Sequence, residues 1–450
     1  MIKSRIMRPH LILLLAPLGF LFALLGPNAS SLEGTNLGGV KLAATWDSPW
    51  AKQFSAPDPA VEAIVQQYVQ NLAQDGWDPT RQGVWIQTGR ATVAQHQGTV
   101  LLSAASLTKI ATTLSALETW APNQQFETLV GITGTIQNGV LSGDLVIQGG
   151  GDPLFVWEEA IVLANSLQKM GIQQVTGNLV ILGDFAMNFE TDPYESGQML
   201  RQALNAKLWS QAASNQYRTL PAGTPQPMIQ VDGGVQVLPL DAANQVTSWL
   251  IRHQSLPVIA ILKAMNIYSN NVMSEMVAEK VGGTEAVMSK ATQAAKLEPG
   301  EISLINGSGL GPENKITPRA IAAMLVAIED KLKPQGFSVA DVLPVSGEDV
   351  GTLVNRQIPL KSAVKTGSLA EVSALAGFIP TQERGPVWFT IINWGWDLNG
   401  LRIQQDTLLK QIQAHWGVAD APSTFQSKVH LKQSPYQLGN PDRNQPFKDN

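Results

Sequence analysis

The sequence predicts an α+β protein in which an accessory β-rich domain is inserted into a larger domain of helices and strands. Two observations carry this prediction. Segments with a helical apolar period stand on both sides of residues 124–238, where short β-rich segments punctuated by glycine replace them. The chain also has 450 residues, of which 44% are hydrophobic, so it can form two or three domains with at least one sizeable core.

The larger domain is expected over residues 58–123 and 239–416. Its first helix is predicted over 59–73, because an aspartate precedes it as a cap and its apolar residues share one face. Two strands, 83–88 and 91–95, flank a Gly-Arg turn and are predicted to form a hairpin.

The accessory domain is expected over 124–238. The segment 142–147 recurs loosely as 176–181, and the stretch 157–170 between them has a helical period. This pattern predicts a strand, helix, strand unit that occurs twice, which is too few copies for a solenoid. Asp152, in a glycine-rich stretch, is interpreted as a turn residue and not as a substrate ligand.

The second part of the larger domain begins with helical patterns from 241 to 297, interrupted at 268–271. A capped helix with proline in its first turn is predicted over 317–329. Strands follow at 362–364, 372–379 and 387–393, then a helix at 401–415. Residues 417–450, rich in Gln, Asn, Ser and Pro, are predicted to be a flexible tail.

The first 31 residues have the order of a secretory signal. Lys3, Arg5 and Arg8 precede an apolar run over 11–25, and small residues follow it. The run is shorter than the ~20 apolar residues that span a bilayer comfortably, which favours a cleaved signal over a retained N-terminal anchor. Either way we expect the protein in the periplasm or cell envelope, with peripheral membrane association if the segment is retained. Residues 32–57 are predicted to be a linker.

The composition excludes several classes of partner and of catalytic group. The net charge is −5 and the basic residues are scattered, so no nucleic-acid partner is expected. The absence of cysteine excludes disulfides, thiolate catalysis and thiolate metal sites. The five histidines lie far apart in the sequence, so it predicts neither a metal site nor a Ser-His-Asp triad, and no cofactor is expected.

Three short motifs can together support acyl transfer without histidine: Ser106-Leu-Thr-Lys109, Ser269-Asn-Asn271 and Lys365-Thr-Gly367. Ser106 and Lys109 are three residues apart, so on a helix they share one face. Ser106 is the predicted nucleophile, and Lys109 is the predicted base because burial can lower the pKa of its amine. A second S-x-x-K, Ser166 to Lys169, falls at the far end of a predicted helix and is assigned to a solvated face.

The second motif lies at a break between two predicted helices. Such a loop can place the Ser269 hydroxyl as a proton relay between Lys109 and the leaving group, and the Asn271 amide against the substrate backbone. The hydroxyl of Tyr268 is an alternative relay. Taken alone, the tripeptide is typical of an Asn-rich helix cap.

The third motif follows a short strand. Lys365 and Thr366 can bind a carboxylate, and Gly367 lets the strand lie close to a substrate backbone. The backbone N–H of Ser368 is predicted to form an oxyanion hole with that of Ser106. Alone, this motif is typical of a strand-end turn with a surface lysine, so the prediction depends on the three motifs together.

With these motifs the chain resembles a penicillin-recognising serine DD-peptidase, of the penicillin-binding protein 4 type of D-alanyl-D-alanine carboxypeptidase and endopeptidase. The resemblance covers roughly residues 56–416. Beside the three motifs it rests on the segments 138–153, 171–178, 265–266 and 307–310.

The resemblance implies a fold, a reaction and a set of roles. The fold is a three-layer α/β/α domain with a central antiparallel sheet and a domain inserted between the first and second motifs. The enzyme would be a serine-type D-Ala-D-Ala carboxypeptidase that acts on peptidoglycan stem peptides and is inhibited covalently by β-lactam antibiotics. The implied roles are Ser106 as acylated serine, Lys109 as its base, Ser269 and Asn271 as second motif, and Lys365, Thr366 and Gly367 as third.

Three departures from this family bear on substrate preference. Ile267 stands where the family usually has a lysine, and Asn306 where an aspartate commonly precedes Gly-Ser-Gly. Residues 191–215 do not match the Trp- and Asp-rich segment that recognises the side-chain amine of the stem peptide.

Two alternative functions stay open at this point. A β-lactamase or an esterase of the same fold would need fast deacylation, and the sequence contains no separate glutamate-containing motif for it. A non-catalytic cell-wall-binding protein could keep the fold without the reaction.

Overall fold

The computed structural model describes residues 57–447. The predicted signal or anchor and the predicted linker up to residue 56 lie outside the described residues. Among the residues that the structure does describe, none of the helices has the length and apolar character needed to cross a membrane.

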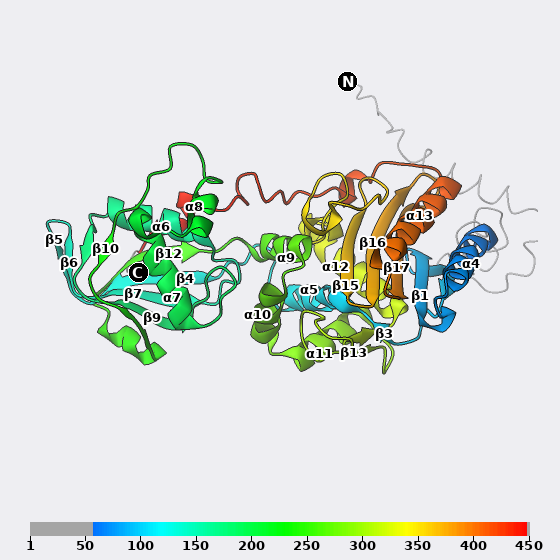
Figure 1. Cartoon of the computed structure of the whole chain (residues 1–450), viewed down its shortest axis with the longest axis horizontal. Coiled ribbons are helices and arrows are strands. Elements are labelled where there is room, and N and C mark those ends of the chain that lie inside the picture. The colour runs from blue at the N-terminus through cyan, green and yellow to red at the C-terminus, as the bar shows by residue number, and fades with distance from the viewer. Residues whose placement is uncertain (1–56, 448–450) are drawn as a thin grey trace, which may run out of the picture. The chain divides into compact units, whose positions relative to one another are not determined.

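A five-stranded antiparallel sheet forms the centre of the larger domain, in the strand order β15-β16-β17-β1-β2 (Figure 1). Its strands are β1 (Gln82–Thr88), β2 (Ala91–His96), β15 (Ala363–Leu369), β16 (Val372–Thr381) and β17 (Gly385–Trp394). The predicted hairpin is β1 and β2, and the three later predicted strands are β15, β16 and β17. Because β1 pairs with β17, strands far apart in sequence meet in the middle of the sheet.

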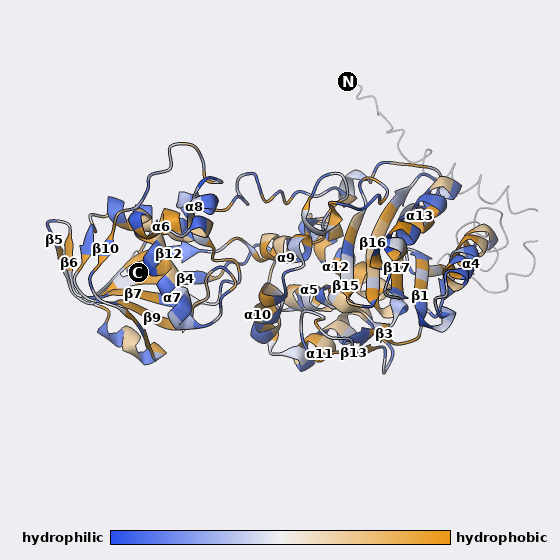
Figure 2. Ribbon diagram, viewed as in Figure 1, coloured by the Kyte–Doolittle hydropathy of each residue, from blue (hydrophilic) through white to orange (hydrophobic). Residues whose placement is uncertain are grey.

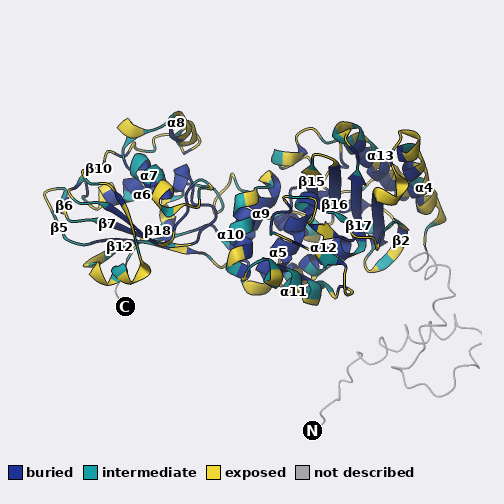
Figure 3. Ribbon diagram, turned by 60° about the horizontal axis from the view of Figure 1, so that its bottom comes forward, coloured by how far each residue is buried: buried dark blue, intermediate teal, exposed yellow. Residues whose placement is uncertain are grey.

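Helices cover both faces of this sheet. On one face lie α4 (Pro59–Gln74) and α13 (Leu398–Trp416), and on the other α5 (Thr108–Thr119) and α12 (Pro318–Leu332). Along β16, Leu375 packs with the first pair while its neighbours Ala374 and Ala376 pack with the second, as the alternation of side chains along a strand requires. The central strands β16 and β17 are largely apolar in Figure 2 and buried in Figure 3. The three-layer α/β/α fold is therefore confirmed.

Further elements complete the larger domain on the α5 side. They are the helices α9 (Val258–Tyr268), α10 (Asn271–Val281) and α11 (Thr284–Ala295), and a small sheet of β3 (Leu102–Ser103), β14 (Lys315–Ile316) and β13 (Ile302–Ser303). The predicted break in the helical pattern is the junction of α9 and α10.

The accessory domain contains two sheets and three helices. The larger sheet has the order β11 (Val235–Leu238), β9 (Leu179–Asp184), β7 (Leu145–Gly150), β4 (Glu127–Ile132), β12 (Ser248–Gln254) and β18 (Asn444–Pro446). The smaller has β10 (Gln230–Val231), β8 (Gln174–Val175), β6 (Val140–Ser142) and β5 (Thr135–Gln137). The helices are α6 (Trp157–Lys169), α7 (Pro193–Ala203) and α8 (Gln211–Tyr217).

The predicted repeat corresponds to β7 and β9. The two strands pair in parallel with Leu145 opposite Leu179 and Ile147 opposite Ile181, and α6 lies between them in the chain. Equivalent residues of the two copies thus lie side by side in one sheet.

One sequence prediction is wrong at the end of the accessory domain. Residues 248–254, expected within a helical stretch of the larger domain, form β12 and pair with β4. The side chains of Ile251 and His253 are buried while Arg252 between them is not, which is the alternation of a half-buried strand. The accessory domain therefore extends past residue 238 to about 254.

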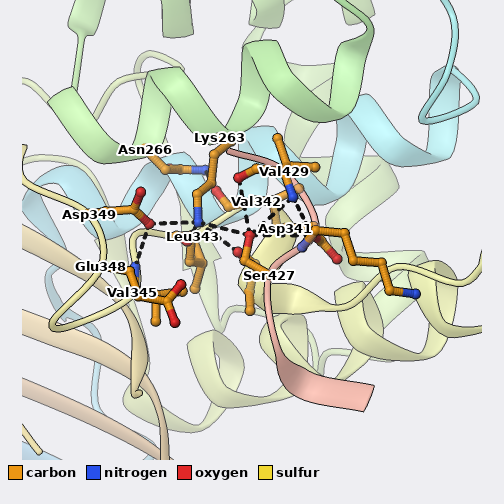
Figure 4. Close-up of polar contacts among 12 residues, drawn as sticks. Lys263, Asn266, Asp341, Val342, Leu343, Val345, Glu348, Asp349, Ser427 and Val429 are labelled. Atoms are coloured by element: carbon orange, nitrogen blue, oxygen red, sulfur yellow. Dashed lines mark hydrogen bonds and ion pairs between the residues drawn. The ribbon is translucent and has the colours of Figure 1, made fainter. Parts of the chain in front are cut away.

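The predicted flexible tail is a second correction, because residues 417–447 are packed. The Phe425 ring lies 5.1 Å from that of Phe378, edge to face. Lys428 and Val429 donate their backbone N–H groups to the Asp341 carboxylate, and Figure 4 shows the contact of Val429. Only a few residues of this segment make such contacts, and the rest are mostly polar. The composition of the segment therefore did not indicate that it packs against the domain.

Farther along this segment, β18 pairs with β12, and Arg443 forms a buried ion pair with Glu159. The last described strand therefore belongs to the accessory sheet.

Candidate active site

Ser106 lies in a one-turn 3-10 helix (Ala105–Leu107) that leads directly into α5. Ala105, immediately before it, has a φ of +47°, in the left-handed region that is unfavourable for a residue with a side chain. Ala105 is fully buried, so the surrounding packing holds this strained turn. The predicted serine thus follows a conformationally strained residue at the start of the helix.

The three motifs line one cavity of about 960 Å³. Ser106, Ser269, Asn271, Thr366 and Ser368 are among its lining residues. Lys109 and Lys365 are fully buried beneath this surface. The structure therefore brings together residues that are separated by up to 262 positions in the sequence.

The Lys109 ammonium nitrogen contacts three oxygen atoms. Its Nζ lies 3.1 Å from Ser106 Oγ, 2.8 Å from Asn271 Oδ1 and 2.7 Å from the Ser308 carbonyl oxygen. Burial lowers the pKa of Lys109 to about 7, and the Glu275 carboxylate opposes this shift. A large neutral fraction is then present at neutral pH, which a base needs.

Ser269 and Lys365 form a second pair. Lys365 Nζ donates to Ser269 Oγ at 3.0 Å and to the Thr366 carbonyl at 2.7 Å. Burial, and then the charge of Lys109, hold the pKa of Lys365 well below its usual range. The hydrogen-bond partner of Ser269 is therefore Lys365, where the sequence predicted a relay from Lys109.

The Ser-Asn-Asn sequence produces this arrangement locally. Ser269 ends α9 with a left-handed φ of 51°, and Asn270 begins α10 by accepting the Met273 N–H at 3.0 Å. The central residue is therefore the helix cap that the tripeptide alone suggests. Ser269 and Asn271, on either side, line the cavity.

Ser368 directly follows the buried part of β15, the edge strand of the central sheet, and is exposed to the cavity. A Cβ at Gly367 would lie 3.0 Å from the Ala104 carbonyl oxygen, so this strand passes closely beside the Ser106 turn. This contact brings the strand segment before Ser368 beside the turn that carries Ser106, and the oxyanion hole of their backbone N–H groups stays a prediction.

The competing candidates from the sequence lie elsewhere. Lys169 of the second S-x-x-K is exposed, and Ser166 donates to the Val162 carbonyl of its own helix. Tyr268 is 56% exposed and is not among the residues that line the cavity. Asp152 accepts the Leu154 N–H at 2.8 Å, a turn contact within the accessory domain.

The family model for the D-Ala-D-Ala carboxypeptidase 3 (S13) family matches residues 65–188 and 225–413. The chain belongs to the S13 family. Members are serine-type D-Ala-D-Ala carboxypeptidases, so the protein is a hydrolase of this class, and the non-catalytic alternative is not supported.

Individual relatives agree with this assignment. D-alanyl-D-alanine carboxypeptidase DacB of Haemophilus influenzae is 25% identical over 391 residues, which cover 65% of this chain and 80% of the relative.

Two solved structures show the same fold. The Bdellovibrio bacteriovorus predatory endopeptidase Bd3459, acylated by penicillin G and in complex with immunity protein Bd3460, has a TM-score of 0.68 at 20% identity, with 81% of this chain and 99% of that chain covered. Penicillin-binding protein 4 of Haemophilus influenzae has a TM-score of 0.55 at 21% identity, with coverages of 77% and 98%.

Sequence reasoning missed three contributors to the site of this S13 family member. The Ser308 carbonyl contacts Lys109, and Glu275 holds the Ser308 loop. Arg402 of α13 lines the cavity and donates to Ser368 Oγ at 3.0 Å. The Gly307–Leu310 segment was noticed only as part of the family resemblance, and no local signal distinguished Glu275 or Arg402 from other helix surface residues.

Residues 57–447 contain no group of three or more His, Asp or Glu side chains placed to hold a metal ion.

Proposed function

We propose that Ser106 is the nucleophile of this carboxypeptidase and carries its acyl-enzyme. The observation that supports this most directly is the position of Lys109, a fully buried amine with a pKa near 7 that contacts Ser106 Oγ. A neutral lysine in this position can accept the serine proton as the hydroxyl attacks.

In the acylation step, Ser106 Oγ bonds to the carbonyl carbon of the penultimate D-alanine of a stem peptide. The oxyanion that forms accepts hydrogen bonds from the backbone N–H groups of Ser106 and Ser368. The C–N bond to the terminal D-alanine then breaks. The proton that Lys109 took from Ser106 is returned to the leaving nitrogen, with the Ser269 hydroxyl, held by Lys365, as the group that carries it across the cavity.

In the deacylation step, water attacks the ester carbonyl and Lys109 accepts its proton. The ester bond breaks, the shortened peptide leaves as a carboxylic acid, and Ser106 regains its hydrogen. Lys365 supports the cycle, because its Nζ donates a hydrogen bond to Ser269 Oγ and so holds that hydroxyl in place.

We extend the proposal to the cleavage of crosslinked stem peptides, since the same acyl-enzyme serves both reactions. The likeness to an endopeptidase of the same fold supports this extension. Assays of monomeric and crosslinked muropeptides side by side test it, and release of D-alanine without cleavage of crosslinks would restrict the enzyme to carboxypeptidase activity.

Labelled penicillin tests the nucleophile. We expect a long-lived adduct on Ser106, identified by peptide mass spectrometry, and no adduct in Ser106→Ala. Rapid turnover of penicillin by the wild type would instead identify a β-lactamase. Release of D-alanine by Ser106→Ala at the wild-type rate would exclude this site from the reaction.

We also propose that the protein is exported to the periplasm or cell envelope. The basic, apolar and small-residue order of the first 31 residues supports this. Cell fractionation with mass analysis of the mature N-terminus tests it, and recovery of the full-length chain in the cytoplasm would contradict it.

A further inference from the structure

The loop that carries Ser308 is held from two sides. The Glu275 carboxylate, on α10, accepts the backbone N–H of Gly307 at 3.0 Å with one oxygen and that of Ser308 at 2.9 Å with the other. The hydroxyls of Thr112 and Ser274 donate to the Gly307 carbonyl at 2.6 and 2.7 Å. The peptide group that joins Gly307 to Ser308 is therefore fixed in orientation.

Glycine lets this loop lie between α10 and the Ser106 turn. A Cβ at Gly307 would lie 2.4 Å from Ala278 Cβ, so a side chain there would push the loop off α10. Gly309 has a φ of +82°, and a Cβ there would lie 1.9 Å from the Ala105 carbonyl oxygen. The loop thus links Glu275 to the immediate surroundings of the nucleophile.

The three contacts of Lys109 decide how a neutral amine is oriented. A neutral lysine has two N–H bonds and one lone pair. Asn271 Oδ1 and the Ser308 carbonyl can only accept, so they take the two N–H bonds. The lone pair is then left for Ser106 Oγ, the third partner and one that can donate.

We propose that Glu275 is a positioning residue that, through the Ser308 peptide, holds the Lys109 amine with its lone pair directed at Ser106. The inference rests on the proposed roles of Ser106 and Lys109. It assigns Glu275 no contact with the substrate.

Glu275 has a second, electrostatic effect that can be separated from the first. Two charged groups from neighbouring elements act on Lys109: Lys365 from β15, of like charge when protonated, and Glu275 from α10. The negative charge of Glu275 raises the pKa of Lys109 against the effect of burial. Removal of that charge should increase the neutral fraction of Lys109 at acidic pH.

The test is the pH profile of acylation by a chromogenic β-lactam, measured on full-length protein and normalised to the active sites titrated by labelled penicillin. Glu275→Gln keeps the shape but removes the charge and replaces one acceptor with a donor. Glu275→Asp keeps the charge but is one methylene shorter. Glu279→Gln, one turn farther along α10 and exposed, is the matched control for the loss of a carboxylate.

In Glu275→Gln, we expect the plateau rate to fall about tenfold because the base is misaligned. The acid midpoint of this variant should move down by roughly half a pH unit or more. Glu275→Asp should lower the plateau and keep the midpoint. Glu279→Gln should match the wild type in both.

Two results would overturn the proposal while leaving the function intact. One is a normalised profile of Glu275→Gln that coincides with that of the wild type. The other is a variant that loses thermal stability or active fraction while its plateau rate per titrated active site stays at the wild-type value, since a purely structural role does not change that rate. Absence of any Ser106 adduct in the wild type would instead reject the proposed function, and the inference with it.

Discussion

Two fully buried lysines in the larger domain have almost the same surroundings and different consequences. Lys109 contacts a hydroxyl, an amide oxygen and a carbonyl, all of them neutral. Lys263, on α9, contacts the carbonyls of Ala340 and Leu343 and also the Asp349 carboxylate at 2.8 Å (Figure 4).

The carboxylate is the difference that matters. Burial lowers the pKa of both lysines, but at Lys263 the Asp349 charge in direct contact opposes the shift. Lys263 lies away from the cavity and ties α9 to the 340–349 segment, so it holds structure. Lys109 lacks such a partner and faces the nucleophile, so it can exchange a proton. Burial alone therefore does not identify a catalytic lysine.

The largest expected effect is on catalysis. Lys109→Met keeps the volume of the side chain but removes the base, so acylation by labelled penicillin should slow about a thousandfold. The melting temperature should stay near that of the wild type or rise, because the variant no longer has to bury an amine that lacks a charged partner. Acylation of this variant at the wild-type rate would show that Lys109 is not the base and does not differ from Lys263 in this respect.

The mirror variant should act on stability. Lys263→Met leaves the Asp349 carboxylate and two carbonyls without their partner, so we expect a loss of about 3 kcal/mol in the free energy of unfolding. Urea denaturation measures this, and the acylation rate per titrated active site should stay within a few-fold of the wild type. Intact stability with lost acylation would assign Lys263 to the catalytic machinery.

The pH dependence should follow Lys109. Its protonated form cannot accept the Ser106 proton, so acylation should rise with pH through about 7 and then level off. Below the midpoint the rate should fall about tenfold per pH unit. Stopped-flow acylation between acidic and alkaline pH checks this, and a flat profile would show that another group is the base.

The smallest effect is expected at the second S-x-x-K. Lys169 is exposed on the accessory domain, so Lys169→Met should leave both acylation and the free energy of unfolding nearly unchanged. A clear loss of D-alanine release in this variant would show that the accessory domain takes part in the reaction.

The sequence was informative where chemistry and periodicity coincide. Ser106, Lys109, Ser269 and Lys365 were predicted as one site because each motif carries a specific combination of reactive groups, and the strand repeat at β7 and β9 was found because equivalent residues recur. Glu275 was missed because its role is to hold a backbone loop from another part of the chain. Residues 417–447 were missed because their packing depends on isolated anchors such as Phe425 and Arg443.

The pairing of β18 with β12 has a consequence for how the chain reaches its final state. The edge of β12 is closed by residues 444–446, so a chain that stops before them presents an unpaired edge on the accessory sheet. Unpaired edges favour association with other strands. The accessory sheet is thus completed only once residues 444–446 have been made, and a product shortened before them exposes the edge of β12 to other strands.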